Sequence, residues 1–271
     1  MPKIGKCGLC LRQQDLQLSH LLPAALYRMT RDPDTNRKNR NPVLITRDIT
    51  MTTSEQVREY FLCSECEQRF SAQGENYALS QVHNGKRFPL LEALYAIAPS
   101  NTVPARAETP EFRMYSEKDT PKINRTRLLY FCMSIFWRAS AHLWKGLRPT
   151  ELGPYGESIR KYLLGETAFP SRISVQLFVA TDWLTQNTIF DPSTMKRFGP
   201  FKSHGFVTRG LVWWMHVGKQ VPIDFYNICF ETANKAIVVN DCEAKTLQVY
   251  TELGKTSRVA LALQKEMSGR A

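Results

Sequence analysis

The chain has 271 residues, of which 43% are hydrophobic, and it carries a formal net charge of +11 with a pI of about 9.4. This length predicts one large domain or two smaller ones, and the excess of cations favours a polyanionic partner over a merely basic soluble protein. No segment reads as a secretory signal or reaches the length of a spanning helix, so we expect a cytoplasmic protein without a membrane partner.

Two Cys-x-x-Cys pairs lie in the first quarter of the chain, Cys7 with Cys10 and Cys63 with Cys66. Four thiolates are the number that a tetrahedral structural zinc site needs. A thioredoxin-type redox pair would explain one Cys-x-x-Cys but not the second, and two disulfides would need an oxidising compartment. The spacing therefore predicts one zinc ion bound by all four cysteines.

The segment after the first pair predicts a short strand over 16–18 that ends at Ser19 and His20. Pro23 follows, and residues 24–29 are typical of a helical turn that begins after a proline. The next stretch is polar and is expected to be a loop. Its cations, which could bind phosphate groups or form a solvated surface, are Arg28, Arg31, Arg37, Lys38 and Arg40.

Residues 43–46 and 48–52 predict a hairpin, and residues 53–57 a capped helical turn. Beyond the second cysteine pair, residues 67–82 favour a helix, although Gly74 weakens it. Another helix is expected over 86–97, after Pro89.

The stretch 98–121 contains four prolines and many small or charged residues, so it predicts a linker. Residues 1–97 would then form a zinc-binding domain and residues 122–271 a second domain that recognises a target or partner. In this second part we expect an α+β arrangement of helices followed by a mainly antiparallel sheet. The predicted elements are helices over 123–144, 154–164 and 256–267, and strands over 173–180, 205–217, 225–230 and 236–239.

Residues 5–80 resemble the HNH endonuclease superfamily. The features that they share with it are one Cys-x-x-Cys pair, a strand that ends in His20, and a second pair that opens a helix. The resemblance implies a ββα-metal fold of the treble-clef type with a four-cysteine zinc site. It also implies that His20 is a general base that activates water for attack on a phosphodiester bond. A divalent ion, Mg²⁺ or Mn²⁺, would polarise the phosphate.

The sequence departs from the family pattern around this histidine. Ser19 stands where the family has an acid or a histidine, and Glu67 stands where a histidine often follows the last cysteine. Gln56 is the nearest candidate for the family's asparagine, and Glu75 is a further possible carboxylate ligand. In the alternative interpretation, His20 is a polar residue of a small zinc domain, Glu67 interacts with the helix dipole and Gln56 is ordinary surface.

The resemblance therefore leads to two hypotheses of different classes. The first is a metal-dependent nuclease that cleaves DNA in preference to RNA, with a defence role in restriction or antiphage systems and a partner protein from such a system. The second is a catalytically inactive zinc module that binds nucleic acid or a partner protein.

Overall fold

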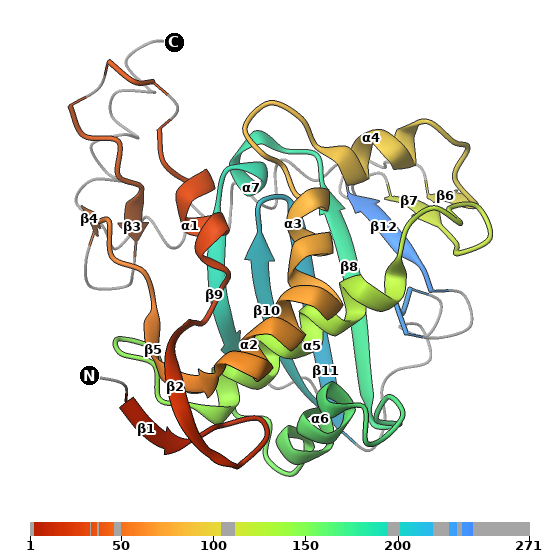
Figure 1. Ribbon diagram of the computed structural model, residues 1–271. Coiled ribbons are helices and arrows are strands. Elements are labelled where there is room, and N and C mark those ends of the chain that lie inside the picture. Colours follow the sequence, from red (N-terminus) through yellow and green to blue (C-terminus); the bar gives the residue numbers. More distant parts are fainter. Residues whose placement is uncertain are drawn as a thin grey trace.

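The computed structural model describes residues 3–32, 34–36, 38–45, 50–103, 112–194, 201–218, 228–231 and 235–240 (Figure 1). It confirms the predicted α+β fold. A small N-terminal sheet with the four cysteines is followed by helices and by a mixed, mostly antiparallel seven-stranded sheet.

The small sheet has the order β1-β2-β5, with both pairs antiparallel. Its strands are β1 (Lys3–Lys6), β2 (Gln13–His20) and β5 (Arg58–Cys63). The register between β2 and β5 shifts at Phe61, which is an extra residue in β5 and therefore a β-bulge. Next to the bulge, Leu18 is exposed and Ser19 is buried. The predicted strand that ends at His20 is confirmed.

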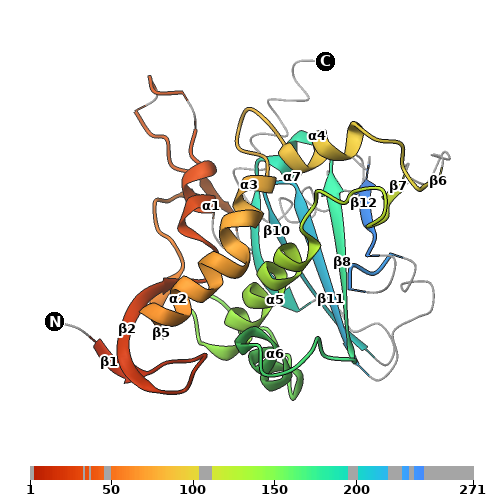
Figure 2. The same cartoon turned by 45° about the vertical axis from the view of Figure 1, so that its right-hand side comes forward.

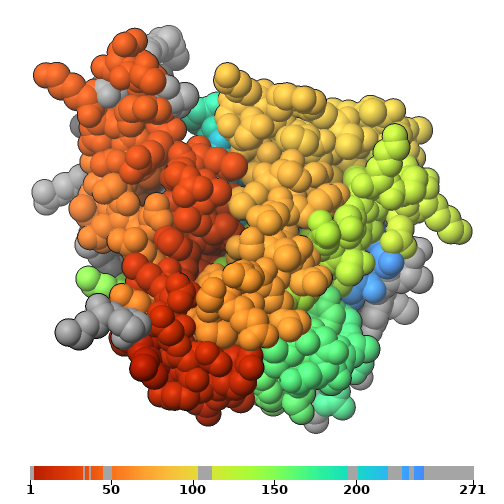
Figure 3. All heavy atoms as spheres, viewed as in Figure 1, coloured from red at the N-terminus to blue at the C-terminus, as the bar shows by residue number. Residues whose placement is uncertain are grey.

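A long insertion separates β2 from β5 and forms the upper left corner in Figure 3. It contains α1 (Ala24–Met29) and the hairpin of β3 (Val43–Ile45) and β4 (Thr50–Thr52), as predicted, while residues 46–49 lie outside the described ranges. The helical turn expected over 53–57 is wrong. The Thr53 hydroxyl accepts a hydrogen bond from the Glu55 amide at 3.0 Å, a local turn that does not continue into a helix.

The predicted helix after the second cysteine pair is confirmed and is interrupted by one wider turn. It comprises α2 (Ser64–Phe70), the π-helical segment η1 (Ser71–Glu75) and α3 (Asn76–Gln81). This run lies beside α5 (Arg125–Ala141), which separates it from the large sheet (Figures 1 and 2). The close approach depends on Gly74, because a Cβ there would lie 2.7 Å from the backbone nitrogen of Phe131.

The large sheet has the order β6-β7-β12-β8-β11-β10-β9, and all neighbours are antiparallel except β12 and β8. Its strands are β6 (Asn101–Val103), β7 (Phe112–Tyr115), β8 (Ile173–Ala180), β9 (Ile189–Thr194), β10 (Phe201–Thr208), β11 (Leu211–Gly218) and β12 (Ile237–Asn240). The remaining helices are α4 (Pro89–Tyr95), α6 (Tyr155–Leu164) and α7 (Trp183–Gln186).

Three expectations about this half need correction. The single strand predicted over 205–217 is part of a hairpin, because Arg209 (φ +50°) and Gly210 (φ +94°) form a tight turn with positive φ at both positions. The strand predicted over 225–230 is wrong for residues 228–230, which are not a strand, and its first part, 225–227, lies outside the described residues. The predicted helix over 256–267 also lies outside them. The segment 98–121 is not a plain linker where it is described, because β6 and β7 belong to the sheet.

One hydrophobic core extends from the cysteines to the large sheet. Trp137 of α5 stacks on Phe61 with ring centroids 5.4 Å apart, and Phe136 contacts Phe206 of β10 at 4.9 Å. The division into two domains stays a prediction, but α5 joins the two parts through its buried side chains. Within the described ranges, none of the helices combines the length and hydropathy that a membrane crossing requires.

Candidate metal centre and the surroundings of His20

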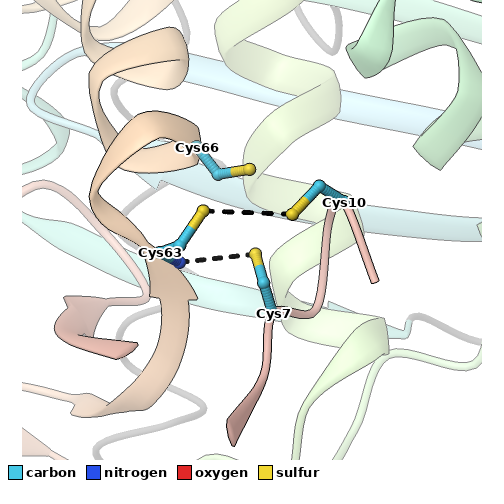
Figure 4. Close-up of side chains that lie close together, drawn as sticks. All are labelled: Cys7, Cys10, Cys63 and Cys66. Atoms are coloured by element: carbon cyan, nitrogen blue, oxygen red, sulfur yellow. Dashed lines mark hydrogen bonds between the residues drawn. The ribbon is translucent and has the colours of Figure 1, made fainter. Parts of the chain in front are cut away.

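Three elements bring the four cysteines together (Figure 4). Cys7 and Cys10 lie on the turn after β1, Cys63 ends β5 and Cys66 lies in the first turn of α2. All four sulfur atoms lie within 4.8 Å of one another, and the sulfurs of Cys10 and Cys63 are 3.9 Å apart. Tetrahedral zinc with Zn–S bonds of about 2.3 Å places its sulfurs about 3.8 Å apart. The cluster can therefore bind zinc.

The turn that carries the first pair is fixed against β5 by backbone contacts. The amide of Gly8 donates to the carbonyl of Phe61 at 3.0 Å, and a Cβ at position 8 would lie only 2.1 Å from the Phe61 ring. The amide of Cys63 donates to the sulfur of Cys7 at 3.3 Å. A glycine between the two cysteines thus lets their sulfurs reach the end of the strand.

The electrostatic surroundings favour some thiolate character in the cluster. A hydrogen bond from the Cys66 thiol, assisted by backbone amides and opposed by burial, lowers the pKa of Cys7, and the same hydrogen bond raises the pKa of Cys66. Four cysteines on one zinc ion carry a net charge of −2. Arg12 and Arg160 both interact electrostatically with Cys10, so both cations offset part of this charge.

His20 is the last residue of β2, and its imidazole is half-buried. Its Nε2 atom is buried and finds no hydrogen-bond partner among the described residues. Burial is the largest influence on this group and lowers its pKa. Arg58 and Arg138 lower the pKa as well, whereas Gln56 and Glu67 raise it. The net effect favours a neutral imidazole with a free ring nitrogen at pH 7.

The structure brings two of the predicted site residues to His20. Gln56, in the segment between β4 and β5, lies near the imidazole and raises its pKa through its side chain. Glu67, in the first turn of α2, acts on it through its charge, and its Oε1 atom is buried without a partner among the described residues. Tyr27 of α1 also lies nearby, with its ring centroid 6.4 Å from that of His20. His20, Gln56 and Glu67 therefore form one group.

Two further residues near this group have other partners. Ser19 is 1% exposed, and its hydroxyl accepts a hydrogen bond from the Leu62 amide at 3.1 Å, so its side chain binds the backbone of β5. Glu75 forms an ion pair with Arg138, with Oε1 and Nη2 2.5 Å apart. The carboxylate of Glu75 is therefore already paired with the Arg138 cation, and its role as a metal ligand stays a prediction.

In the described part of the chain, the cysteines are the only group of three or more His, Cys, Asp or Glu side chains whose ligand atoms come together in this way. The side chains of His20, Glu67 and Glu75 do not form such a group. Magnesium is usually held by one or two carboxylates together with substrate phosphates. A single carboxylate with an unpartnered oxygen, such as that of Glu67, is compatible with that mode.

The predicted phosphate-binding cations lie on the insertion between β2 and β5. Arg28, Arg31, Lys38 and Arg40 are exposed, and Arg37 lies outside the described residues. The Arg40 Nε atom donates to the carbonyl of Asp32 at 2.7 Å, which ties the two ends of the loop together. The remaining charges face solvent and are accessible to a polyanion.

Arg138 is the residue near His20 that sequence reasoning missed. The signal that could have revealed it is a charged side chain within an α-helix that is apolar almost all round. Comparison with known proteins gives no further guide, because no family model, no curated protein and no solved structure matches the chain.

Proposed function

We propose that the protein is a metal-dependent nuclease of the HNH-like kind that hydrolyses phosphodiester bonds, in DNA in preference to RNA. The observation that carries the proposal is the position of His20. It ends β2, the strand that pairs with β5 and its Cys63 of the four-cysteine cluster, and Gln56 and Glu67 act on its imidazole. This placement agrees with the roles that the sequence resemblance implies.

In this proposal each side chain has a distinct task. A neutral His20 accepts the proton of the attacking water at its free Nε2 atom. Gln56, whose side chain acts on the imidazole, helps to orient it. The unpartnered oxygen of Glu67 is available to a divalent ion. When bound, such an ion would polarise the phosphate and stabilise the leaving oxygen.

The exposed cations of the insertion support a nucleic-acid substrate. They belong to a chain with a net charge of +11, and phosphate contacts from lysine and arginine add affinity that does not depend on sequence. A role in defence and a dedicated partner protein rest on the resemblance alone.

A second candidate function is nucleic-acid binding without catalysis. The observation that favours it is that His20, Glu67 and Glu75 do not assemble into a group able to hold a metal ion by themselves. The binding of Ser19 to the β5 backbone points the same way, because the residue that precedes the histidine is a serine with a structural partner and not an acid. In this case zinc would maintain a binding module.

Cleavage of labelled DNA and RNA with Mg²⁺ or Mn²⁺ distinguishes the two functions. We expect His20→Ala to lose about 10²–10⁴ in rate while zinc content and nucleic-acid affinity are retained. His83→Ala is the matched control, since His83 is also partly buried but its Nδ1 contacts the carbonyl of Gln186 at 3.1 Å. Glu67→Gln should lose activity that excess Mn²⁺ partly restores. If the wild type cleaves nothing, or if His20→Ala is as active as His83→Ala, the nuclease proposal is wrong.

A further inference from the structure

A buried arginine connects α5 to the end of the strand that carries His20. The side chain of Arg138 is 2% exposed. Its Nη1 atom donates to the backbone carbonyls of His20, at 3.2 Å, and Leu21, at 3.4 Å. The guanidinium group therefore lies against the backbone at the point where the chain leaves β2.

The same guanidinium group is held from its other side by the helical run. Its Nη2 atom lies 2.5 Å from Oε1 of Glu75, and the two form an ion pair that is not aligned as a hydrogen bond. Its Cζ atom lies over the ring of Phe70, 4.6 Å from the ring centroid. A well-packed apolar side chain often fills a core at least as stably as a buried ion pair. This cation is therefore better explained by what it positions than by the stability it adds.

Arg125 is a second buried arginine in α5, and it serves as a structural comparison for Arg138. Arg125, at the opposite end of α5, donates to the backbone carbonyls of Thr120, Tyr115, Ser116 and Lys235. These carbonyls lie away from His20 in the sequence and belong to other elements. The two residues share helix, burial and chemistry, but only Arg138 binds the backbone of His20.

We propose that Arg138 is a positioning residue for His20, oriented in turn by Glu75. By fixing the carbonyls of His20 and Leu21, it fixes the backbone from which the imidazole projects, and so the direction of Nε2. This inference rests on the proposed nuclease function and deepens it, since it makes α5 a required part of the site. The N-terminal 97 residues alone would then hold the histidine in the wrong orientation.

The test compares Arg138→Lys with Arg125→Lys in the full-length protein. A lysine at position 138 can still face Glu75 but cannot also donate to two carbonyls from a planar fork. Two properties are measured: the side-chain ¹⁵N resonances of His20, identified among the five histidines by their loss in His20→Ala, and kcat and KM for DNA cleavage with Mn²⁺.

We expect Arg138→Lys to shift the His20 resonances and to lower kcat on the order of 10- to 100-fold, with KM and zinc content within about twofold of wild type. Arg125→Lys should change neither property, even if it lowers thermal stability as much. Unchanged His20 resonances in Arg138→Lys, or equal changes in both variants, would overturn the proposal.

Two further outcomes keep the proposal separate from the nuclease assignment. If the wild type cleaves no nucleic acid, a His20 shift in Arg138→Lys alone still supports positioning, while the proposed activity fails. If Arg138→Lys does not fold, Glu75→Gln removes the counter-ion at nearly constant shape. We expect it to shift the same resonances by a smaller amount, and their invariance would overturn the proposal.

Discussion

Replacement of Gly74 by alanine tests how closely the helical run of α2, η1 and α3 packs on α5. In an exposed helix, alanine in place of glycine stabilises the protein by about 1 kcal/mol. At position 74, however, the new Cβ would lie 2.7 Å from the nitrogen and 2.9 Å from the Cα of Phe131. These are backbone atoms that cannot rotate away, and overpacking of this kind costs about 1–3 kcal/mol.

The steric effect should therefore outweigh the helix propensity, and Gly74→Ala should lower the free energy of unfolding by up to about 2 kcal/mol. Gly156 in α6 is the matched control, because a Cβ there would come no closer than 3.8 Å to the Ser140 hydroxyl. Gly156→Ala should be neutral or stabilising by up to about 1 kcal/mol. Urea unfolding followed by tryptophan fluorescence measures both. Equal stabilisation by the two substitutions would refute the packing described for η1.

Three further predictions concern the candidate site. Cys66→Ser should abolish zinc binding and destabilise the N-terminal sheet, whereas the control Cys132→Ser, which changes a buried thiol of α5 outside the cluster, should keep its zinc. Elemental analysis after gel filtration measures the zinc content of both variants. Zinc retention by Cys66→Ser would contradict the four-cysteine site. Replacing Lys38 and Arg40 by alanine should weaken DNA binding. It should also reduce the slope of log K against log salt concentration by about 0.9 for each phosphate that these side chains neutralise, as measured by fluorescence anisotropy. An unchanged slope would mean that the loop is only a solvated surface. The rate of cleavage should rise with pH as the His20 imidazole loses its proton. Because burial lowers the pKa of His20, the midpoint of this rise should lie below pH 6.5. A midpoint above that pH would contradict the buried environment.

The metal centre could be predicted from the sequence because its signal is local. Two Cys-x-x-Cys pairs supply the four thiolates of a zinc site by spacing alone, and the strand before His20 and the helix around Cys66 follow from short apolar patterns. Gln56 and Glu67 could be named as neighbours of His20 only because the order of elements resembles a known arrangement. The structure brings them to the histidine through β2, α2 and the segment before β5.

The parts that were missed depend on contacts between distant segments. Arg138 reaches the carbonyl of His20 across 118 positions, and while its charge within an apolar helix marks it as unusual, the sequence of α5 does not indicate its partner. Ser19 stands where the HNH family has an acid or a histidine, and the register of β2 against β5 turns its hydroxyl to the Leu62 amide. The proline-rich stretch 98–121 resembled a linker by composition, although sheet pairing gives parts of it regular structure.

The metal content of the purified full-length chain tests most directly whether Cys7, Cys10, Cys63 and Cys66 hold one zinc ion. Native mass spectrometry combined with elemental analysis should find one zinc per chain, retained through dialysis and released, with loss of folded structure in the N-terminal sheet, by a strong chelator. A folded protein that contains no zinc, and whose circular dichroism and melting are unchanged by added Zn²⁺ or chelator, would contradict the account.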